Sequence, residues 1–185
     1  MPGYCEFAKD NPIHQPYHDT EYGFPTKDER VLFERLSLEI MQAGLSWEIV
    51  LKKRAGMNAA FHRFDVDRVA AYGDRETARL LADANIIRNR LKVAAIIENA
   101  KRFKALRSEG GIAKWLERHH PMSKKDWTKV FKKSFKFTGG EIVGEFLMSI
   151  GYLPSPHETS CPVHATIMAL SPPWAGVDPK VYDEV

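Results

Sequence analysis

Four residues at the two ends of the chain carry side chains that zinc prefers. Cys5 and His18 lie near the N-terminus, and His157 and Cys161 lie near the C-terminus, separated by three residues. Two thiolates and two imidazoles complete a tetrahedral Zn²⁺ site and leave no position for a reacting water. A metal bound here would join the two ends of the chain, and the chemistry would lie elsewhere. The alternative is two reduced cysteines in the core and two surface histidines.

Length and composition are those of a single globular domain. The chain has 185 residues, of which 44% are hydrophobic, enough for a sizeable core without disulfides. No segment has the roughly 18 to 20 consecutive apolar residues of a membrane helix. The N-terminus lacks the basic start and apolar run of a secretory signal. We therefore expect a cytoplasmic protein without a membrane partner, and thiolates in place of a disulfide.

The basic residues are concentrated in one segment. Residues 86–136 hold 15 of the 27 Lys and Arg but only 4 of the 24 acids, a net charge of +11, whereas the remainder of the chain carries −8. Such an asymmetry is typical of a face that binds a polyanion and favours nucleic acid as the partner. The alternative is that these cations are scattered over solvated helix faces.

Helical periodicity runs through most of the chain and predicts an all-α fold. Thr26 and Glu29 have the spacing of a capping box, and the apolar stripe after them ends at Gly44. Sustained two-residue alternation is missing, so β-structure should be minor. The segment 171–185 begins with Ser-Pro-Pro and is expected to be an extended strap or a frayed end. Further helices are expected to begin at Ser46, Asp65 and Asp74 and to cover 88–106, 112–119, 123–133 and 142–150.

A short connection between two of these helices has the features of a helix-hairpin-helix, at about residues 78–100. Ile86 and Ile87 can anchor the turn in the core, and Asn85 stands where such hairpins usually have a glycine with positive φ. A helix N-terminus with cations beside it binds phosphate without reading sequence. An ordinary helix–helix connection with surface arginines is the alternative. The cations at the start of the second helix are Arg88, Arg90 and Lys92.

Several ordered motifs carry a family resemblance. They are Tyr17-His18-Asp19-x-Glu21-Tyr22-Gly23, Leu38-Glu39-x-x-Gln42-Ala43-Gly44-Leu45-Ser46-Trp47, Ile86-Ile87-Arg88-Asn89-Arg90-x-Lys92 and Phe135-Lys136-Phe137-x-Gly139. The sequence resembles DNA-3-methyladenine glycosylase I, a family of the helix-hairpin-helix superfamily of DNA glycosylases. The resemblance runs from about Cys5 to Cys161, so it covers nearly the whole chain.

The resemblance implies a fold, a reaction and a metal. The fold would be one glycosylase domain, residues 1–185, with two helical lobes. The reaction would be base-excision repair in the bacterial cytoplasm, at the nucleoid: a monomer would extrude 3-methyladenine from double-stranded DNA containing alkylated bases and hydrolyse its N-glycosidic bond. Free 3-methyladenine and an abasic site would be the products. The family also implies one structural Zn²⁺ held by Cys5, His18, His157 and Cys161.

The resemblance also assigns roles to individual residues. Glu39 would accept hydrogen bonds from the amino edge of the base and complement its charge, as the only essential anion of the site. Tyr17, Tyr22 and Trp47 would shape an aromatic pocket suited to a cation. Gly44 and Leu45 would fill the gap left in the duplex. Superfamily members often have a catalytic Asp after the hairpin, and no obvious candidate occupies that place here.

Three positions depart from the family pattern. Phe7 and Tyr22 stand where Trp is usual, and both keep an aromatic face. His14 stands where Tyr is usual, and it would either donate a hydrogen bond to the base or become cationic and repel it. The resemblance implies that all three contact the substrate. These departures leave open a second function, a catalytically inactive, zinc-stabilised DNA-binding protein of the same fold.

Overall fold

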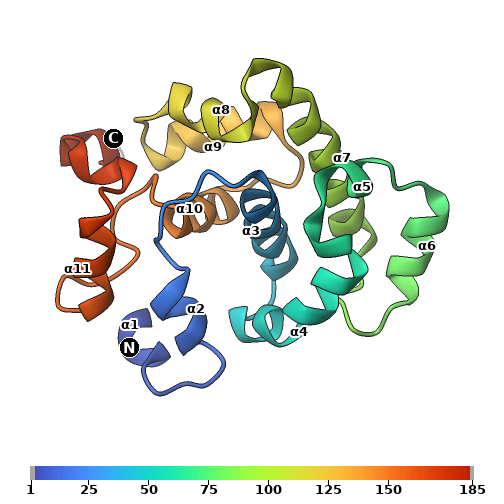
Figure 1. Cartoon of the computed structure of the whole chain (residues 1–185), viewed down its shortest axis with the longest axis horizontal. Coiled ribbons are helices and arrows are strands. Elements are labelled where there is room, and N and C mark those ends of the chain that lie inside the picture. The colour runs from blue at the N-terminus through green and yellow to red at the C-terminus, as the bar shows by residue number, and fades with distance from the viewer. Residues whose placement is uncertain (1–2, 184–185) are drawn as a thin grey trace.

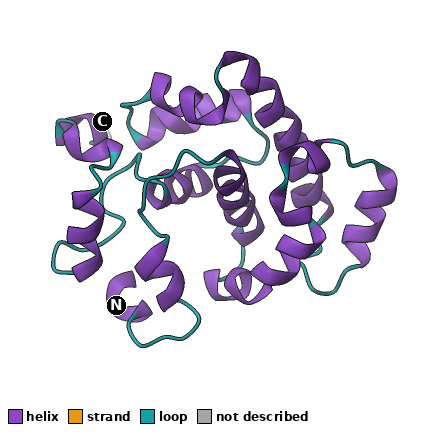
Figure 2. Ribbon diagram, viewed as in Figure 1, coloured by secondary structure: helices purple, strands orange, loops and turns teal. Residues whose placement is uncertain are grey.

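The computed structural model describes residues 3–183 and contains no β-strand among them. Figures 1 and 2 show helices joined by short loops, with α3 and α10 at the centre of the view. The prediction of an all-α fold is confirmed. No helix in the described part of the chain is long and apolar enough to cross a membrane.

Helix α3 (Glu29–Gln42) is the centre of the core, and every residue from Leu32 to Met41 is buried. It begins where Asp28 accepts a hydrogen bond from the Val31 N–H at 3.0 Å, so Asp28 is the N-cap. The prediction of Thr26 as the cap is wrong. The Thr26 hydroxyl instead accepts from the Asp28 N–H, one turn before the helix, which positions the residue that does cap it.

Helix α4 (Trp47–Ala60) follows α3 after a turn of four residues. Ser46 caps it, as predicted, by accepting a hydrogen bond from the Ile49 N–H. Gly44 has a φ of +78° in this turn, a conformation that favours glycine. The turn therefore reverses the chain tightly and leaves Leu45 partly exposed.

Helices α5 (Val66–Ala70), α6 (Asp74–Ala82) and α7 (Arg90–Leu106) complete one side of the molecule, and α6 lies at its edge (Figure 1). Asp65 caps α5 as predicted. Helix α7 starts two residues later than predicted, because the Asn89 side chain accepts from the Lys92 N–H.

The turn between α6 and α7 is held by the core and by α4. Ile86 and Ile87 are buried as predicted. Asn85 is not among the residues with positive φ, so the expected left-handed backbone is wrong. The turn instead packs against Gly56 of α4, where a Cβ would lie 2.4 Å from the Asn85 carbonyl oxygen. Close approach of two backbones, and not a left-handed residue, is what needs a glycine here.

The remaining predicted helices are α8 (Gly111–His119), α9 (Lys124–Ser134) and α10 (Gly140–Ser149). Their boundaries differ from the prediction by one or two residues. Helix α10 packs on both α3 and α9. One continuous hydrophobic cluster runs from Leu32 to Leu153 and includes residues of all these helices.

Three short helices near the ends were not predicted: α1 (Tyr4–Ala8), α2 (Gln15–Thr20) and α11 (Pro162–Ala169). They lie together on one side of the molecule (Figure 1). The C-terminal segment differs from the expected extended strap. It forms two 3₁₀ turns, Pro173–Gly176 and Pro179–Tyr182, and the Trp174 N–H donates to the Gly151 carbonyl at 3.2 Å. Residues 184–185 lie outside the described residues.

Candidate active site and metal centre

Four of the predicted site residues line one small cavity. Its volume is about 270 Å³, and its walls come from α1, α2, α3, the start of α4 and α10. The predicted members are Tyr17, Tyr22, Glu39 and Trp47; Tyr4, Gln42 and Glu145 complete the lining. The structure thus brings together residues that are separated by up to 141 positions in the sequence. We call this cavity the aromatic pocket.

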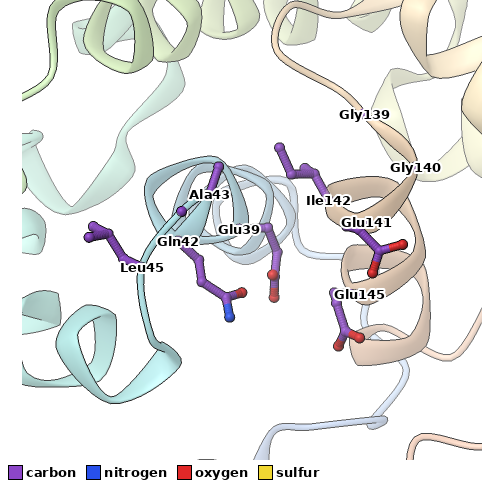
Figure 3. Close-up of a pocket in the computed structure, with 10 residues that line it drawn as sticks. Glu39, Gln42, Ala43, Leu45, Gly139, Gly140, Glu141, Ile142 and Glu145 are labelled. Carbon is purple, nitrogen blue, oxygen red and sulfur yellow. The ribbon is translucent and has the colours of Figure 1, made fainter.

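A second hollow of about 480 Å³ adjoins the aromatic pocket (Figure 3). It lies between the α3–α4 turn, which carries Gly44 and Leu45, and the start of α10. Glu39, Gln42 and Glu145 line both spaces. These three side chains therefore lie at the entrance through which a ligand would pass from the second hollow into the aromatic pocket.

Glu39 is a buried carboxylate that has no hydrogen-bond donor among the described residues. Only 5% of the residue is exposed. Burial raises the pKa of Glu39 well above its usual range, Glu145 raises it further, and Arg35 opposes both. Buried acids are normally paired, so an unpaired one that lines a cavity indicates a group kept for a ligand.

The aromatic side chains form a cage beside this carboxylate. The Tyr17 ring centroid lies 5.1 Å from that of Trp47 and 5.7 Å from that of Tyr22. Behind Tyr17, the Arg35 guanidinium lies 5.0 Å from the ring centroid and donates to the Tyr17 hydroxyl at 3.4 Å. Glu21 fixes Arg35 through a bond of 2.9 Å. Tyr17 is therefore held in place before any ligand enters.

Two predicted substrate contacts are displaced from the pocket. Phe7 is 48% exposed and does not line the cavity. His14 is buried against Phe7, with ring centroids 5.0 Å apart, and its Nδ1 lies 3.3 Å from the Tyr4 hydroxyl. Tyr4 occupies the wall instead. Burial lowers the pKa of His14, which favours the neutral ring. A contact of His14 with the base, either as a hydrogen-bond donor or as a repelling cation, stays a prediction.

Gln42 and Glu145 were missed at the sequence level, although each carried a signal. Gln42 follows Glu39 by three residues and so shares its helix face. Glu145 interrupts the apolar run of α10, as Glu39 interrupts that of α3. Two carboxylates, Glu39 and Glu145, line the pocket, whereas the sequence singled out only Glu39. That Glu39 is the one essential anion stays a prediction.

The turn that carries Leu45 is supported by an unexpected residue. Lys92 is only 5% exposed, and its ammonium donates to the carbonyls of Met41 and Ala43 at 2.7 and 2.6 Å. Lys92 was predicted to contact a DNA phosphate. Its ammonium instead binds the carbonyls at the end of α3. Its place near the hairpin arginines in the sequence concealed this role.

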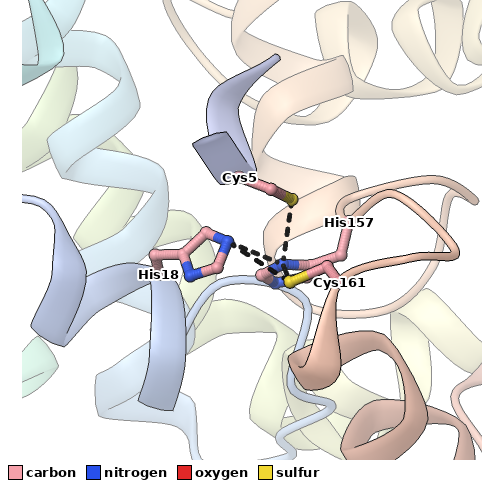
Figure 4. Close-up of side chains that lie close together, drawn as sticks. All are labelled: Cys5, His18, His157 and Cys161. Carbon is pink, nitrogen blue, oxygen red and sulfur yellow. Dashed lines mark hydrogen bonds between the residues drawn. The ribbon is translucent and has the colours of Figure 1, made fainter. Parts of the chain in front are cut away.

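The four candidate metal ligands converge although one pair lies near each end of the chain (Figure 4). His157 Nδ1 lies 3.0 Å from His18 Nε2, 3.6 Å from Cys5 Sγ and 3.7 Å from Cys161 Sγ. Cys161 Sγ lies 3.8 Å from His18 Nε2. A tetrahedral Zn²⁺ with two sulfur and two nitrogen ligands separates these atoms by roughly 3.3 to 3.8 Å. Three of these four separations fall in that range, the distance between the two histidine nitrogens is 0.3 Å shorter, and all four ligand atoms lie within 4.8 Å of one another. The cluster could therefore hold a metal ion of this size.

The outward nitrogens of both histidines are already bonded. Nε2 of His157 lies 2.6 Å from the Tyr22 carbonyl, and Nδ1 of His18 lies 2.6 Å from an Asp19 carboxylate oxygen. Each partner is a hydrogen-bond acceptor, so the outward nitrogen carries the hydrogen, and in the neutral ring the inward nitrogen has a free lone pair. Metal-binding histidines have this arrangement, because the outer partner fixes both the tautomer and the ring orientation.

Comparison with known proteins identifies the family. The sequence matches the methyladenine glycosylase family over residues 7–130. The chain belongs to this family. It is 36% identical over 177 residues to DNA-3-methyladenine glycosylase 1 of Escherichia coli strain K12, an alignment covering 85% of this chain and 94% of the relative.

Solved structures also show that the chain has the fold of the methyladenine glycosylases. A crystal structure of 3-methyladenine DNA glycosylase I has a TM-score of 0.76 and 37% identity, covering 85% of this chain and 97% of that one. A tyrosine-to-phenylalanine variant of 3-methyladenine DNA glycosylase I, crystallised with 3-methyladenine, has a TM-score of 0.78 and 29% identity, with coverage of 86% and 96%.

In this methyladenine glycosylase, many charges of the basic segment are neutralised. Arg107, for example, pairs with Glu29 and Asp67, which lie outside the segment. Within the described residues, no ion pair is formed by Arg88 and Arg90, at the turn between α6 and α7, or by Lys132, Lys133 and Lys136 around the end of α9. The unpaired positive charge is therefore confined to fewer residues than the net charge of +11 for residues 86–136 suggested.

Proposed function

We propose that the protein is a monofunctional DNA glycosylase of base-excision repair. It extrudes 3-methyladenine from alkylated double-stranded DNA into the aromatic pocket and hydrolyses the N-glycosidic bond. The observation that carries the proposal is Glu39, a buried carboxylate without a donor, beside the rings of Tyr17 and Trp47. The relative crystallised with 3-methyladenine supports the same ligand.

The chemistry needs little more than this pocket. Methylation at N3 gives the purine a positive charge, so the bond from C1′ to N9 breaks with its electron pair moving to the base, which leaves neutral. Water adds to C1′ and loses a proton. The rings attract the cation through their faces, and Glu39 accepts hydrogen bonds from its amino edge. No catalytic Asp is required, because the substrate is already activated.

The DNA contacts follow from the surroundings of the pocket. Leu45, at the tip of the α3–α4 turn with Gly44, fills the gap left by the extruded nucleotide. Arg88 and Arg90, exposed at the hairpin, bind the phosphates of the duplex without reading sequence. The site is complete within one chain, so we propose a monomer with a single glycosylase domain, acting on the nucleoid in the cytoplasm.

We also propose that Cys5, His18, His157 and Cys161 hold one structural Zn²⁺. Four protein ligands fit the separations in the cluster and leave no place for a substrate water. When bound, the ion would fix α1, α2 and α11 to one another. Because α1 and α2 carry Tyr4 and Tyr17, the ligands would also stabilise one wall of the aromatic pocket.

The deciding experiment measures base release. The protein is incubated with duplex DNA methylated at N3 of adenine, and free 3-methyladenine is quantified by chromatography. We expect release from methylated but not from unmethylated duplex. Normal duplex binding without any release would contradict the proposal and favour the alternative, an inactive DNA-binding protein of the same fold.

A further inference from the structure

Glu145 is a second acid in the aromatic pocket. It lies on α10 and points into the same space as Glu39 of α3 (Figure 3). Its one side-chain hydrogen bond among the described residues comes from Tyr22, whose hydroxyl donates to Glu145 Oε2 at 3.3 Å. The same hydroxyl belongs to a ring of the pocket wall. One carboxylate oxygen is thus oriented by the pocket, and the other remains available.

The neighbouring acid of α10 behaves differently. Glu141 lies one turn earlier, has a side chain that is 92% exposed, and pairs with Lys124 at 3.1 Å. Within the described residues, no lysine or arginine pairs with Glu145. A half-buried acid kept for stability would have acquired such a partner, since partial desolvation without a partner costs free energy. The absence of one indicates a ligand.

We propose that Glu145 is a second carboxylate that binds the extruded base, so that Glu39 and Glu145 together select a purine by its positive charge. This inference rests on the proposed function. Two acids beside one cavity repel each other when it is empty, and a cation between them relieves the repulsion. A neutral purine gains nothing comparable, so a pair discriminates charge more strongly than one carboxylate does.

The proton affinities of the two acids agree with this arrangement. Burial raises the pKa of Glu145, the hydrogen bond from Tyr22 lowers it, the charge of Glu141 raises it and the charge of Lys124 lowers it, with a raised pKa as the net result. Glu145 in turn raises the pKa of Glu39. Both acids are therefore destabilised as anions in the free protein. A bound cation would favour the ionised form of both.

The test compares two ligands that differ in charge. 3,9-Dimethyladeninium keeps the positive charge of the N3-methylated nucleoside because both nitrogens are alkylated, whereas 3-methyladenine is the uncharged product. Their affinities for the full-length protein are measured by isothermal titration calorimetry. Glu145→Gln keeps the shape and an acceptor for the Tyr22 hydroxyl. We expect it to weaken binding of the cation about tenfold and to leave the neutral base within about twofold.

Glu141→Gln is the matched control, since it changes the net charge by the same amount on the same helix but lies outside the aromatic pocket. We expect less than a twofold change for either ligand. Tyr22→Phe is a second variant, which keeps the ring and deletes the hydroxyl that orients Glu145. It should weaken binding of the cation by about two- to fivefold, again selectively.

The outcomes separate this inference from the proposed function. If Glu145→Gln and Tyr22→Phe leave the ratio of the two affinities unchanged while the wild-type protein still releases 3-methyladenine, Glu145 does not bind the base and only the inference fails. If the wild-type protein binds neither ligand and releases no base, the proposed function fails first. A selective loss of cation binding in either variant, with the control unchanged, supports the inference.

Discussion

The aromatic pocket and the Cys/His cluster lie side by side, but they differ in whether their polar groups have hydrogen-bond partners. In the cluster, the nitrogen of each histidine that faces away already has an acceptor, Tyr22 or Asp19. In the pocket, Glu39 has no donor among the described residues. Tyr22 belongs to both: its carbonyl orients His157, and its ring and hydroxyl face the pocket.

The difference separates a closed site from an open one. A site that holds a structural ion is completed by its outer partners, which fix the ligands whether or not a substrate is present. A site that binds a transient ligand must keep groups unpaired and accept their cost in stability. With the proposed ion bound, the Cys/His cluster should therefore govern folding, and the pocket should govern catalysis.

The sharpest test of this division is Glu39→Gln. The substitution keeps the shape and removes the charge that a cationic base requires. Loss of one partner of a desolvated charge pair costs about 2 kcal/mol or more, so release of 3-methyladenine should fall at least about 30-fold. Affinity for undamaged duplex should stay within twofold. Equal losses of release and of duplex binding would show that Glu39 acts on the fold and not on the base.

The opposite pattern is expected for Cys161→Ser. Removing one thiolate should abolish stoichiometric zinc, and a structural site contributes its binding free energy to folding. The midpoint of thermal unfolding should fall by at least about 6 °C, and a chelator should lower it in the wild-type protein but not in the variant. Metal content is measured by mass spectrometry. Retention of one zinc per chain at unchanged stability would mean that the cluster is not the metal site.

A third variant lies outside both regions. Arg90 is exposed at the start of α7 and has no ion pair within the described residues, so its proposed role is phosphate contact. Arg90→Ala should weaken duplex binding about three- to tenfold and lower the slope of log affinity against log salt by about one. Binding of the free base to the pocket should not change. A loss of free-base affinity would instead couple the hairpin to the aromatic pocket.

The sequence predicted the central helices well, because their caps and apolar stripes are local signals. Ser46 and Asp65 cap α4 and α5 as expected. The short helices α1, α2 and α11 were missed because they show little periodicity and have no side-chain cap, whereas the Asp65 cap marks the equally short α5. They are positioned by tertiary contacts, which explains why Tyr4, next to the predicted ligand Cys5, was not expected in the pocket.

Residues of the site were predicted only where a sequence motif of the family included them. Glu39, Tyr17 and Trp47 were found through the family pattern, and all three line the pocket. Lys92 was misassigned because a charged residue beside two arginines resembles a phosphate contact, whereas the structure uses its length to reach the carbonyls of α3. Glu145 lies about 100 residues from Glu39, and no local pattern joins two acids that meet only when α10 packs on α3.

The last predicted effect is the smallest. It measures directly how much stability the protein loses by keeping Glu39 unpaired in the pocket. A carboxyl whose pKa is raised on folding holds its proton more tightly in the folded state. Stability therefore falls as the pH rises from the pKa of the unfolded chain, about 4.3, through the raised pKa of Glu39.

Glu39→Gln, which has no charge to lose, should unfold about 2 to 4 °C higher than the wild-type protein at pH 8, a gain of about 1 kcal/mol. Near pH 3, well below both pKa values, the two proteins should unfold at the same temperature, because the acid is then largely protonated in both states. Unfolding scans of both proteins from pH 3 to pH 8 measure the difference. If the difference is constant across this range, the free pocket does not hold Glu39 at a cost in stability, and the contrast with the paired histidines of the Cys/His cluster loses its energetic basis.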